Sequence, residues 1–265
     1  MKIMKSYKMQ AVAALAAALC CASCSDTWDD HYSESKEGII NETLWEAISS
    51  NPDLSNFAKV AKACGYDINL NGSQTFTVFA PTNASLTTEE ADSMVNLFNE
   101  QKAQGVKTAD NPVVKQFIQN HIALYKKSVS TETSDSLAMM NGKRQSFTTN
   151  AIGGEDYTSK NTLYNNGILY TINGKIGYEP NVFEYLAQDA DLDSIYTYIN
   201  SFGEYKFSPS QSVAGSVVDG KTQYLDSVMV YNNSIFNQLG YINSEDSTYW
   251  MLAPTNSEWK RMVDA

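Results

Sequence analysis

Hydrophobic residues recur at helical spacing between positions 44 and 64. The recurring positions are Leu44, Ile48, Leu54, Phe57, Ala61 and Cys64. Because Pro52 interrupts this pattern, we expect two helices, with Asp53 or Ser55 as the cap of the second. Gly65 follows the last apolar position, where a helix commonly ends.

A strand and a further helix are expected next. Residues 74–80 are rich in β-branched and aromatic side chains, which favours a strand that ends at Pro81. Thr82 or Asn83 can then cap the following helix by accepting a hydrogen bond from a free backbone amide. Residues 113–125 show the helical pattern again, with their apolar positions along one side.

Paired strands are predicted in the later part of this region. Residues 128–147 alternate and turn, and Asn141-Gly142 is a hairpin signal. Residues 167–172 predict a strand, Asn173-Gly174 a turn of type I′, and Lys175-Ile176 the start of another strand. Helices first and paired strands later are typical of an α+β fold.

The chain also repeats itself. Residues 44–48 (Leu-Trp-Glu-Ala-Ile) resemble residues 182–186 (Val-Phe-Glu-Tyr-Leu) at an offset of 138. The sequence Ala-Pro-Thr-Asn occurs at 80–83 and again at 253–256, at an offset of 173. The larger second offset indicates an insertion in the second copy, within about 204–246. We therefore predict two copies of one domain.

Three blocks of the first copy resemble a known family. They are residues 75–83 (Thr-Phe-Thr-Val-Phe-Ala-Pro-Thr-Asn), His121-Ile122 at the end of a helix, and residues 166–174 (Asn-Gly-Ile-Leu-Tyr-Thr-Ile-Asn-Gly). In this order they are similar to the signatures of the fasciclin-type (FAS1) domain, and they cover residues 39–178. The resemblance implies an α+β fold, a β-sandwich or wedge with flanking α-helices.

The family motif positions of this chain are expected to be structural. They are Phe79, Ala80, Pro81, Thr82, Asn83, His121, Gly167, Ile172 and Gly174. The family often has a tyrosine before the histidine, whereas this chain has Asn120. We expect His121 to be a hydrogen-bonded, partly buried side chain that orders the fold, and a ligand role is the alternative.

Residues 179–265 resemble the first part of a second fasciclin-type domain in tandem with the first. The histidine element and the second signature do not recur in them. We therefore expect a partial domain of a longer protein. Without its remaining strands, a strand ending at Leu252 would lack partners, and Leu186, Ile195 and Ile199 would be poorly covered.

The N-terminus is typical of an exported lipoprotein. Lysines at positions 2, 5 and 8 precede a short apolar run, as in a secretory signal peptide. Cys21-Ala22-Ser23-Cys24 resembles the bacterial lipobox. We predict residues 1–23 as the signal peptide and Cys24 as the lipidated residue. An ordinary signal peptide with spare cysteines is the alternative.

Residues 24–38 are predicted to form a flexible acidic tether. Its stretch from Ser25 to Asp30 resembles the export tag of certain Gram-negative bacteria, which carries lipoproteins to the outer face of the outer membrane. We therefore expect the chain in the cell envelope, lipid-anchored to the outer membrane and surface-exposed. A plain solvated tether is the alternative.

The charge of the chain limits its partners. There are 19 basic and 30 acidic residues, a net charge of −11. Removal of residues 1–23 takes away three lysines and no acidic residue, which leaves −14. Nucleic acid and anionic lipid headgroups are bound by clustered basic residues, so neither is expected as a partner. Membrane association is expected through the lipid anchor.

Catalytic chemistry is not indicated. The sequence contains neither a His-Glu-x-x-His nor a Gly-x-Ser-x-Gly motif, and we predict no phosphate loop. With His31 and His121 as its histidines, we expect no zinc-type metal site, no cofactor and no enzymatic activity. Cys64 is expected to be a buried small hydrophobe rather than a nucleophile.

Two functions follow from the sequence. The first is a non-catalytic adhesion or interaction module that contacts an extracellular protein. The alternative is a glycan-binding accessory lipoprotein of a surface polysaccharide uptake system, with Trp28, Trp250 and Trp259 as candidates for exposed aromatic platforms. Trp45 and Trp259 stand at helix positions typical of a core. Clustered aromatics on one concave face would favour glycan binding, whereas scattered or buried aromatics would favour adhesion.

Overall fold

The computed structural model describes residues 38–210, 213–218, 221–226 and 229–265. The predicted signal peptide, Cys24 and the tether up to residue 37 lie outside the described residues. The chain divides into two compact units, with the boundary between Gly177 and Tyr178. We refer to described residues 38–177 as the N-terminal unit and to residues 178–265 as the C-terminal unit.

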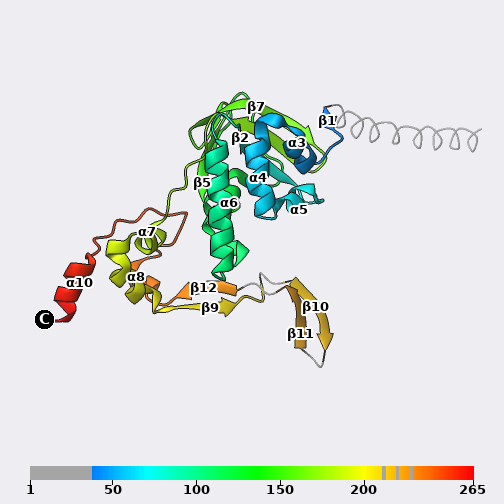
Figure 1. Cartoon of the computed structure of the whole chain (residues 1–265). Coiled ribbons are helices and arrows are strands. Elements are labelled where there is room, and N and C mark those ends of the chain that lie inside the picture. The colour runs from blue at the N-terminus through cyan, green and yellow to red at the C-terminus, as the bar shows by residue number, and fades with distance from the viewer. Residues whose placement is uncertain (1–37, 211–212, 219–220, 227–228) are drawn as a thin grey trace, which may run out of the picture. The chain divides into compact units, whose positions relative to one another are not determined.

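Helices form the first part of the N-terminal unit (Figure 1). They are α3 (Leu44–Ser50), η1 (Pro52–Leu54), α4 (Ser55–Ala63), α5 (Tyr66–Asn71), α6 (Thr88–Ala103) and η2 (Thr108–Asp110). Thr43 begins α3 in a reciprocal capping box with Glu46. Gly65 follows α4 with a φ of +81°, so the predicted end of this helix is confirmed.

One mixed sheet forms most of the remainder of this unit. Its strands are β1 (Ile39–Ile40), β2 (Phe76–Pro81), β3 (Ile122–Leu124), β4 (Ser134–Ala138), β5 (Arg144–Thr148), β6 (Ala151–Ile152), β7 (Glu155–Tyr164) and β8 (Gly167–Ile172). They follow the order β3-β2-β8-β7-β6-β5-β4, and β1 pairs with β7. β2 is parallel to β8 and antiparallel to β3. β3 and β4 are therefore the two ends of the strand order.

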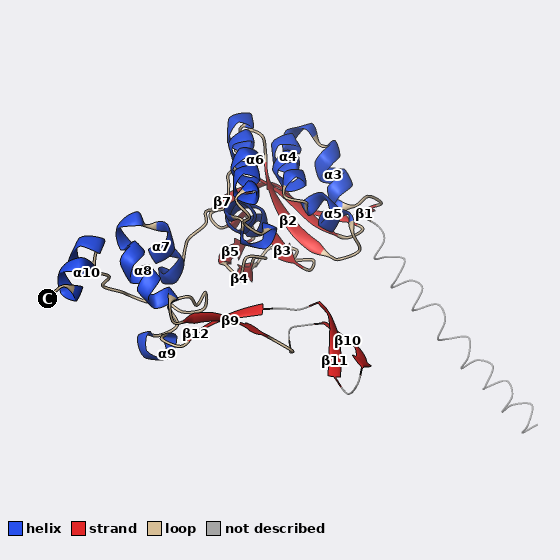
Figure 2. Ribbon diagram, turned by 60° about the horizontal axis from the view of Figure 1, so that its bottom comes forward, coloured by secondary structure: helices blue, strands red, loops and turns tan. Residues whose placement is uncertain are grey.

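Strands β2 and β8 separate two hydrophobic cores. Phe76 and Val78 on one face of β2 pack with the helices α3 to α6, which Figure 2 shows on the same side of this strand. Phe79 on the other face packs with Tyr170 and with buried residues of β4 to β6. Every residue of β2 is buried, because the strand is covered on both faces. The predicted flanking helices are thus present in this unit, and they pack on one mixed sheet.

The predicted helix caps are wrong. Neither Asp53 nor Ser55 caps α4, and Leu54, which precedes its first residue, makes no side-chain capping bond. The helix after β2 is α6, and its cap is Thr87 rather than Thr82 or Asn83. Thr87 forms a capping box with Glu90, which is a better cap because both partners satisfy a free amide.

Two further elements differ from the sequence prediction. The helix predicted over residues 113–125 is a π-helical turn, η3 (Val113–Ile118), and a 3-10 turn, η4 (Gln119–His121), followed by β3. Pairing with β2 draws the last residues into the sheet. After β8, the described chain has no strand at Lys175, and Gly174 lacks the positive φ that a type I′ turn requires.

The C-terminal unit combines helices with two pairs of antiparallel strands. Its elements are α7 (Val182–Gln188), η5 (Ala190–Leu192), α8 (Asp193–Asn200), β9 (Gly203–Phe207), β10 (Val213–Val218), β11 (Lys221–Asp226), β12 (Met229–Asn233), α9 (Phe236–Leu239) and α10 (Asn256–Val263). β9 pairs with β12, and β10 pairs with β11, both antiparallel. The predicted insertion over 204–246 therefore contains most of these strands and α9.

Two predictions for the C-terminal unit are wrong. Leu186, Ile195 and Ile199 are buried rather than poorly covered, because Phe236 and Ile242 from the predicted insertion pack against them. Residues 248–255 contain no strand, so the strand predicted to end at Leu252 is not formed. Its backbone has no adjacent strand with which to pair, and Leu252 is exposed.

None of the helices in the described ranges is long and apolar enough to cross a membrane.

Candidate functional site

The first and third sequence blocks meet as neighbouring strands. The register of β2 and β8 places Phe79 beside Tyr170 and Pro81 beside Ile172. Phe79, Ala80 and Ile172 are fully buried. These motif positions therefore form the centre of the sheet, and their side chains are covered.

Asn83 caps the N-terminus of α4, which precedes it in the chain. Its side-chain oxygen accepts a hydrogen bond from the backbone nitrogen of Asn56 in α4, at 3.1 Å. Its side-chain nitrogen donates to the carbonyl oxygen of Pro52 at 2.8 Å. The backbone nitrogen of Asn83 donates to the carbonyl of Asp53 at 2.8 Å. Asn83 thus ties the loop after β2, where Thr82 also lies, to the η1–α4 junction.

Gly167 lies where no side chain fits. A Cβ atom at this position would collide with the Leu44 side chain and with the backbone oxygen of Phe76. Glycine therefore allows α3 and β2 to approach the start of β8 closely. A Cβ atom at Gly174 would meet the Glu155 carboxylate, which is the end of a flexible side chain.

His121 is fully buried and bonded at both ring nitrogens. Its Nε2 accepts a hydrogen bond from the backbone nitrogen of Ile176 at 3.0 Å, so the ring proton is on Nδ1. Nδ1 then donates to the carbonyl oxygen of Phe117 at 2.8 Å. Burial lowers the pKa of His121 to about 4, and the ring is neutral. With both nitrogens engaged, His121 orders the fold and does not face a ligand.

Asn120 holds the same segment as His121. Its side-chain nitrogen donates to the carbonyl oxygens of Ile176 and Gly177, both at 3.0 Å. Its side-chain oxygen accepts from the Asn141 side chain at 3.0 Å. Asn120 and His121 together fix the chain after β8, and Asn120 has a structural role of its own where the family often has tyrosine.

Residues 125–129, which follow β3, are held in a strained and closely bonded conformation. Tyr125 has a φ of +66°, which is rare for a bulky residue. The buried Thr77 hydroxyl donates to the carbonyl oxygen of Tyr125 at 2.7 Å and accepts from the backbone nitrogen of Lys127 at 2.8 Å. Thr77 therefore fixes the strained turn from the centre of the sheet.

Tyr170 and Asn161 hold the other half of this segment. The Tyr170 hydroxyl donates to the carbonyl oxygen of Lys127 at 2.9 Å. The Asn161 side chain accepts from the backbone nitrogen of Val129 at 2.9 Å and donates to its carbonyl oxygen at 2.8 Å. Asn161 itself has a φ of +59°. Both non-glycine residues that have a positive φ in the described ranges thus belong to one network.

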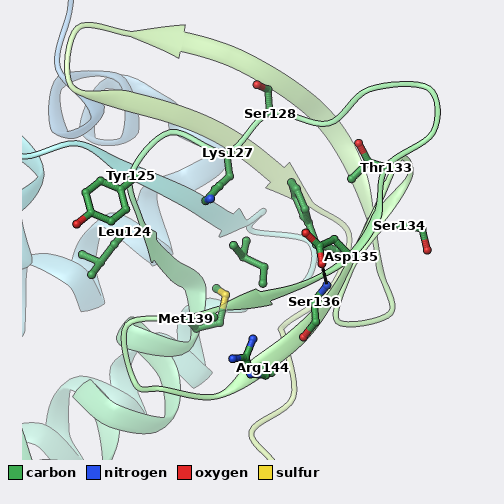
Figure 3. Close-up of a pocket in the computed structure, with 13 residues that line it drawn as sticks. Leu124, Tyr125, Lys127, Ser128, Thr133, Ser134, Asp135, Ser136, Met139 and Arg144 are labelled. Atoms are coloured by element: carbon green, nitrogen blue, oxygen red, sulfur yellow. Dashed lines mark hydrogen bonds between the residues drawn. The ribbon is translucent and has the colours of Figure 1, made fainter. Parts of the chain in front are cut away.

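A groove with a volume of about 690 Å³ lies between this segment and β4. One wall is formed by Leu124, Tyr125 and Lys127, and the other by β4 (Figure 3). Leu137, Met139 and Phe147, which belong to the second core, supply its apolar floor. The groove therefore lies between the two ends of the strand order, and we regard it as the candidate functional site.

The rim of the groove is polar. Hydroxyl groups line it, from Ser128, Thr133, Ser134 and Ser136. Lys127 and Arg144 supply positive charge, and the Asp135 carboxylate accepts from the backbone nitrogen of Ser136 at 2.7 Å. An apolar floor with a few polar groups on the rim is a usual composition for a binding site.

Aromatic side chains do not cluster in this groove. Tyr125 is 68% exposed, whereas the ring of Phe147 is buried. Trp45 and Trp259 pack against the cores of their own units, as predicted. Trp250 is 98% exposed, but it belongs to the C-terminal unit, and Trp28 lies outside the described residues. Other exposed aromatics, among them Tyr198 and Tyr205, also belong to the C-terminal unit, so the groove itself has no aromatic platform for a sugar ring.

Cys64 does not supply a reactive thiol. Cys64 is buried as predicted, and burial raises the pKa of its thiol to about 12. No three His, Cys, Asp or Glu side chains among the described residues are grouped as a metal site requires.

One sequence pattern was missed. Residues 215–222 read Gly-Ser-Val-Val-Asp-Gly-Lys-Thr, which has the spacing of a phosphate loop. A phosphate loop joins a strand to a helix. Here the residues on either side of Asp219 and Gly220 belong to β10 and β11, which pair as antiparallel strands, so no helix follows the first strand.

One comparison with known proteins matches part of the N-terminal unit to a family. Residues 52–176 match the family model of the fasciclin domain. Residues 52–176 therefore correspond to a fasciclin domain, with the mixed sheet and flanking helices of a FAS1-like fold. No curated protein sequence matches the chain.

A FAS1 domain pair from the insect cell adhesion molecule fasciclin I is one similar solved structure. It is 17% identical to this chain, with a TM-score of 0.36. The match covers 51% of this chain and 50% of the insect chain, so the matched region spans about half the length of each chain.

Among the functional residues, sequence reasoning found the buried motif positions and missed the groove. Thr77 and Tyr170 stand inside the quoted blocks, but their bonds to residues 125–129 depend on the fold. Tyr125 carries no sequence signal for a positive φ. Cys24, the predicted lipidation site, lies outside the described residues.

Proposed function

We propose that this chain is a surface-exposed lipoprotein that acts as a non-catalytic adhesion or interaction module. Fasciclin domains are associated with adhesion and interaction. In this proposal the lipid on Cys24 anchors the chain to the outer membrane. The fasciclin domain then makes the contact with a partner outside the cell.

The observation that carries this proposal is the strained turn at Tyr125. Residues held in rare backbone conformations are concentrated at binding and catalytic sites. Here Thr77 and Tyr170, both fully buried, hold an exposed aromatic side chain at the rim of a groove. A rigid wall with an exposed aromatic suits the binding of a partner, because little conformational entropy is lost on contact.

Adhesion of whole cells tests this function. Cells that display the full chain should adhere to an immobilised panel of extracellular and envelope proteins more strongly than cells that lack it. Tyr125→Asn should reduce this adhesion, because asparagine tolerates a positive φ but lacks the ring. Tyr241→Asn removes an exposed tyrosine of the C-terminal unit and is the matched control. Equal adhesion of displaying and non-displaying cells would contradict the proposal.

We also propose that the two units are tandem fasciclin-type domains. The capping box of Thr43 and Glu46 recurs as Asn181 and Glu184, at the offset of 138 found in the sequence. The side chain of Asn256 accepts from the backbone nitrogen of Ser194 at 2.8 Å. This contact has the same form as the contact of Asn83 with Asn56. Equivalent residues thus make equivalent bonds in both units.

A further inference from the structure

Strand β4 presents an unpaired edge to the groove. The backbone nitrogen of Thr149 donates to Thr133, and that of Met139 donates to Lys143, so these residues bond across to β5. Backbone groups alternate in direction along an antiparallel strand. Those of Ser134, Ser136 and Ala138 therefore point away from β5, toward the groove that these residues line.

Strand β3 presents its own edge from the opposite side. The backbone nitrogen of Tyr125 donates to Thr75, which places the backbone groups of Leu124 on the side away from β2. The two edges join at one point, where the backbone nitrogen of Met140 donates to the carbonyl oxygen of Ile122 at 2.8 Å. Beyond this point the groove separates them. The sheet is therefore open between its first and last strands.

Asp135 covers part of the β4 edge. Its carboxylate accepts from the backbone nitrogen of Ser136, one of the groups that point away from β5 (Figure 3). Exposed sheet edges invite pairing with other chains, and charged side chains on the edge restrain it. The backbone groups of Ser134 and Ala138, on either side of Ser136, have no such cover among the described contacts.

The charge of the groove indicates the chemistry of its occupant. Lys127 and Arg144 line the groove, and Asp135 is the one acidic residue among its lining residues. The lining thus carries two basic side chains against one acidic side chain, in a chain with a net charge of −11. Its apolar floor of Leu137 and Phe147 suits an aliphatic side chain. Acidic side chains alternating with aliphatic ones would complement both features.

We propose that the groove binds an extended peptide of a partner protein as an added strand on β4. The peptide alternates apolar residues, which face the floor, with acidic residues, one of which pairs with Lys127. Main-chain bonds to Ser134 and Ala138 supply affinity, as in other cases of strand addition. This inference rests on the proposed interaction function and names the partner of its site.

A synthetic peptide tests the proposal on the full chain purified in detergent. The probe is Glu-Val-Glu-Val-Glu, which matches the five residues of β4. It should bind in a calorimetric titration and slow the amide hydrogen exchange of residues 134–138. A probe that is N-methylated at the amides facing β4 should bind at least about tenfold more weakly, because it cannot donate to the strand edge. Equal binding of the two probes would overturn strand addition.

Lysine variants test the role of positive charge in the groove. Lys127→Ala should weaken probe binding about two- to fivefold, the range for an exposed ion pair. Lys126→Ala removes the same charge from a neighbour outside the groove and should have little effect. The melting temperature of each variant, compared with that of the unchanged chain, confirms that it is folded. If both lysine variants lost the same amount of affinity for the probe, the assigned role of Lys127 would be contradicted.

Substitutions of Asp135 distinguish a peptide ligand from a glycan ligand. Asp135→Asn removes the charge but keeps an acceptor for the Ser136 amide, whereas Asp135→Ala also frees the amide. The probe should therefore bind Asp135→Ala more tightly than Asp135→Asn, and both more tightly than the unchanged chain. Weaker binding to Asp135→Ala, or binding of an oligosaccharide array without binding of the probe, would overturn the proposal.

The cell-adhesion experiment distinguishes this inference from the proposed function. If displaying cells adhere but the probe does not bind, the interaction function stands and the peptide inference is wrong. If the probe binds but the cells do not adhere, strand addition stands and the adhesion function is wrong.

Discussion

The side-chain oxygen of Asn83 lies 3.1 Å from the backbone nitrogen of Asn56 and accepts a hydrogen bond from it. This bond joins the loop after β2 to the start of α4. The first amides of a helix have no partner within the helix, so a side chain from elsewhere can satisfy one of them. Asn83 therefore caps a helix that lies before it in the sequence.

Replacement of Asn83 should destabilise the N-terminal unit. Asn83→Ala removes the acceptor for Asn56 and the donor to Pro52. We expect a loss of about 1–2 kcal/mol in the free energy of unfolding, the cost of a lost helix cap. Urea denaturation followed by circular dichroism measures this loss. A loss close to zero would show that water replaces both bonds.

Asn256→Ala is the matched change in the C-terminal unit. It removes the acceptor for Ser194 and the donor to Ala190. Amide hydrogen exchange of α8 should become faster, while exchange of α4 should not change. Asn83→Ala should show the reverse pattern. If either substitution affected both helices equally, the two contacts would not be independent equivalents.

A side chain at Gly167 should disturb the packing of α3 against the sheet. A Cβ atom there would meet the Leu44 side chain and the backbone of Phe76. We expect Gly167→Ala to cost about 1–3 kcal/mol, the range for overpacking a core. Gly177→Ala is the control, because a Cβ atom at that position meets nothing within 4 Å. Equal melting temperatures for the two variants would contradict this account.

The lipid anchor can be tested at Cys24. Cys24→Ala should abolish labelling of the chain by a radioactive fatty acid, because the lipobox position then has no thiol to carry the lipid. The protein should then be unprocessed or released from the membrane fraction. Cys21→Ala should keep the label, since the lipobox places the modification on the later cysteine. Labelling that persists in Cys24→Ala would contradict the prediction that Cys24 is the lipidated residue.

The sequence was sufficient for elements whose signals are local. Residues 167–172 were predicted as a strand, and β8 has those bounds. The signal of Asn141-Gly142 likewise led to the hairpin of β4 and β5. In both cases the side-chain pattern and the turn residues favour the structure that the fold requires, so local and global preferences agree.

Elements that depend on distant contacts were predicted less well. Ile122 continues a helical pattern, but its segment pairs with β2 and becomes a strand. Asn83 caps a helix 27 residues before it, which no local rule indicates. The groove requires the two ends of the sheet and the strained turn at Tyr125, and neither follows from side-chain pattern. Tertiary contacts decided each of these features.

His121 should make the fold sensitive to acid. Its pKa is lowered to about 4 from an ordinary value of 6.5, chiefly by burial, so the unfolded chain takes up a proton before the folded one does. The contribution of the neutral His121 ring to the free energy of unfolding is therefore fully present above pH 6.5. It is lost as the pH falls from 6.5 to about 4. The shift corresponds to a loss of up to about 3 kcal/mol.

The contribution of His121 can be separated from that of other groups by substitution. The pKa of Glu90 is also lowered in the folded chain, chiefly by its hydrogen bond to Lys175. Glu90 therefore stabilises the folded state less as the pH falls. Urea denaturation of the unchanged chain and of His121→Gln at several pH values isolates the histidine, because Glu90 contributes equally to both. His121→Gln is expected to be less stable at pH 7, since the bonds to Phe117 and Ile176 are perturbed. Its stability should nevertheless fall less steeply between pH 6.5 and 4. Parallel curves for the two proteins would mean that His121 titrates alike in the folded and unfolded chains, which is incompatible with a buried neutral ring.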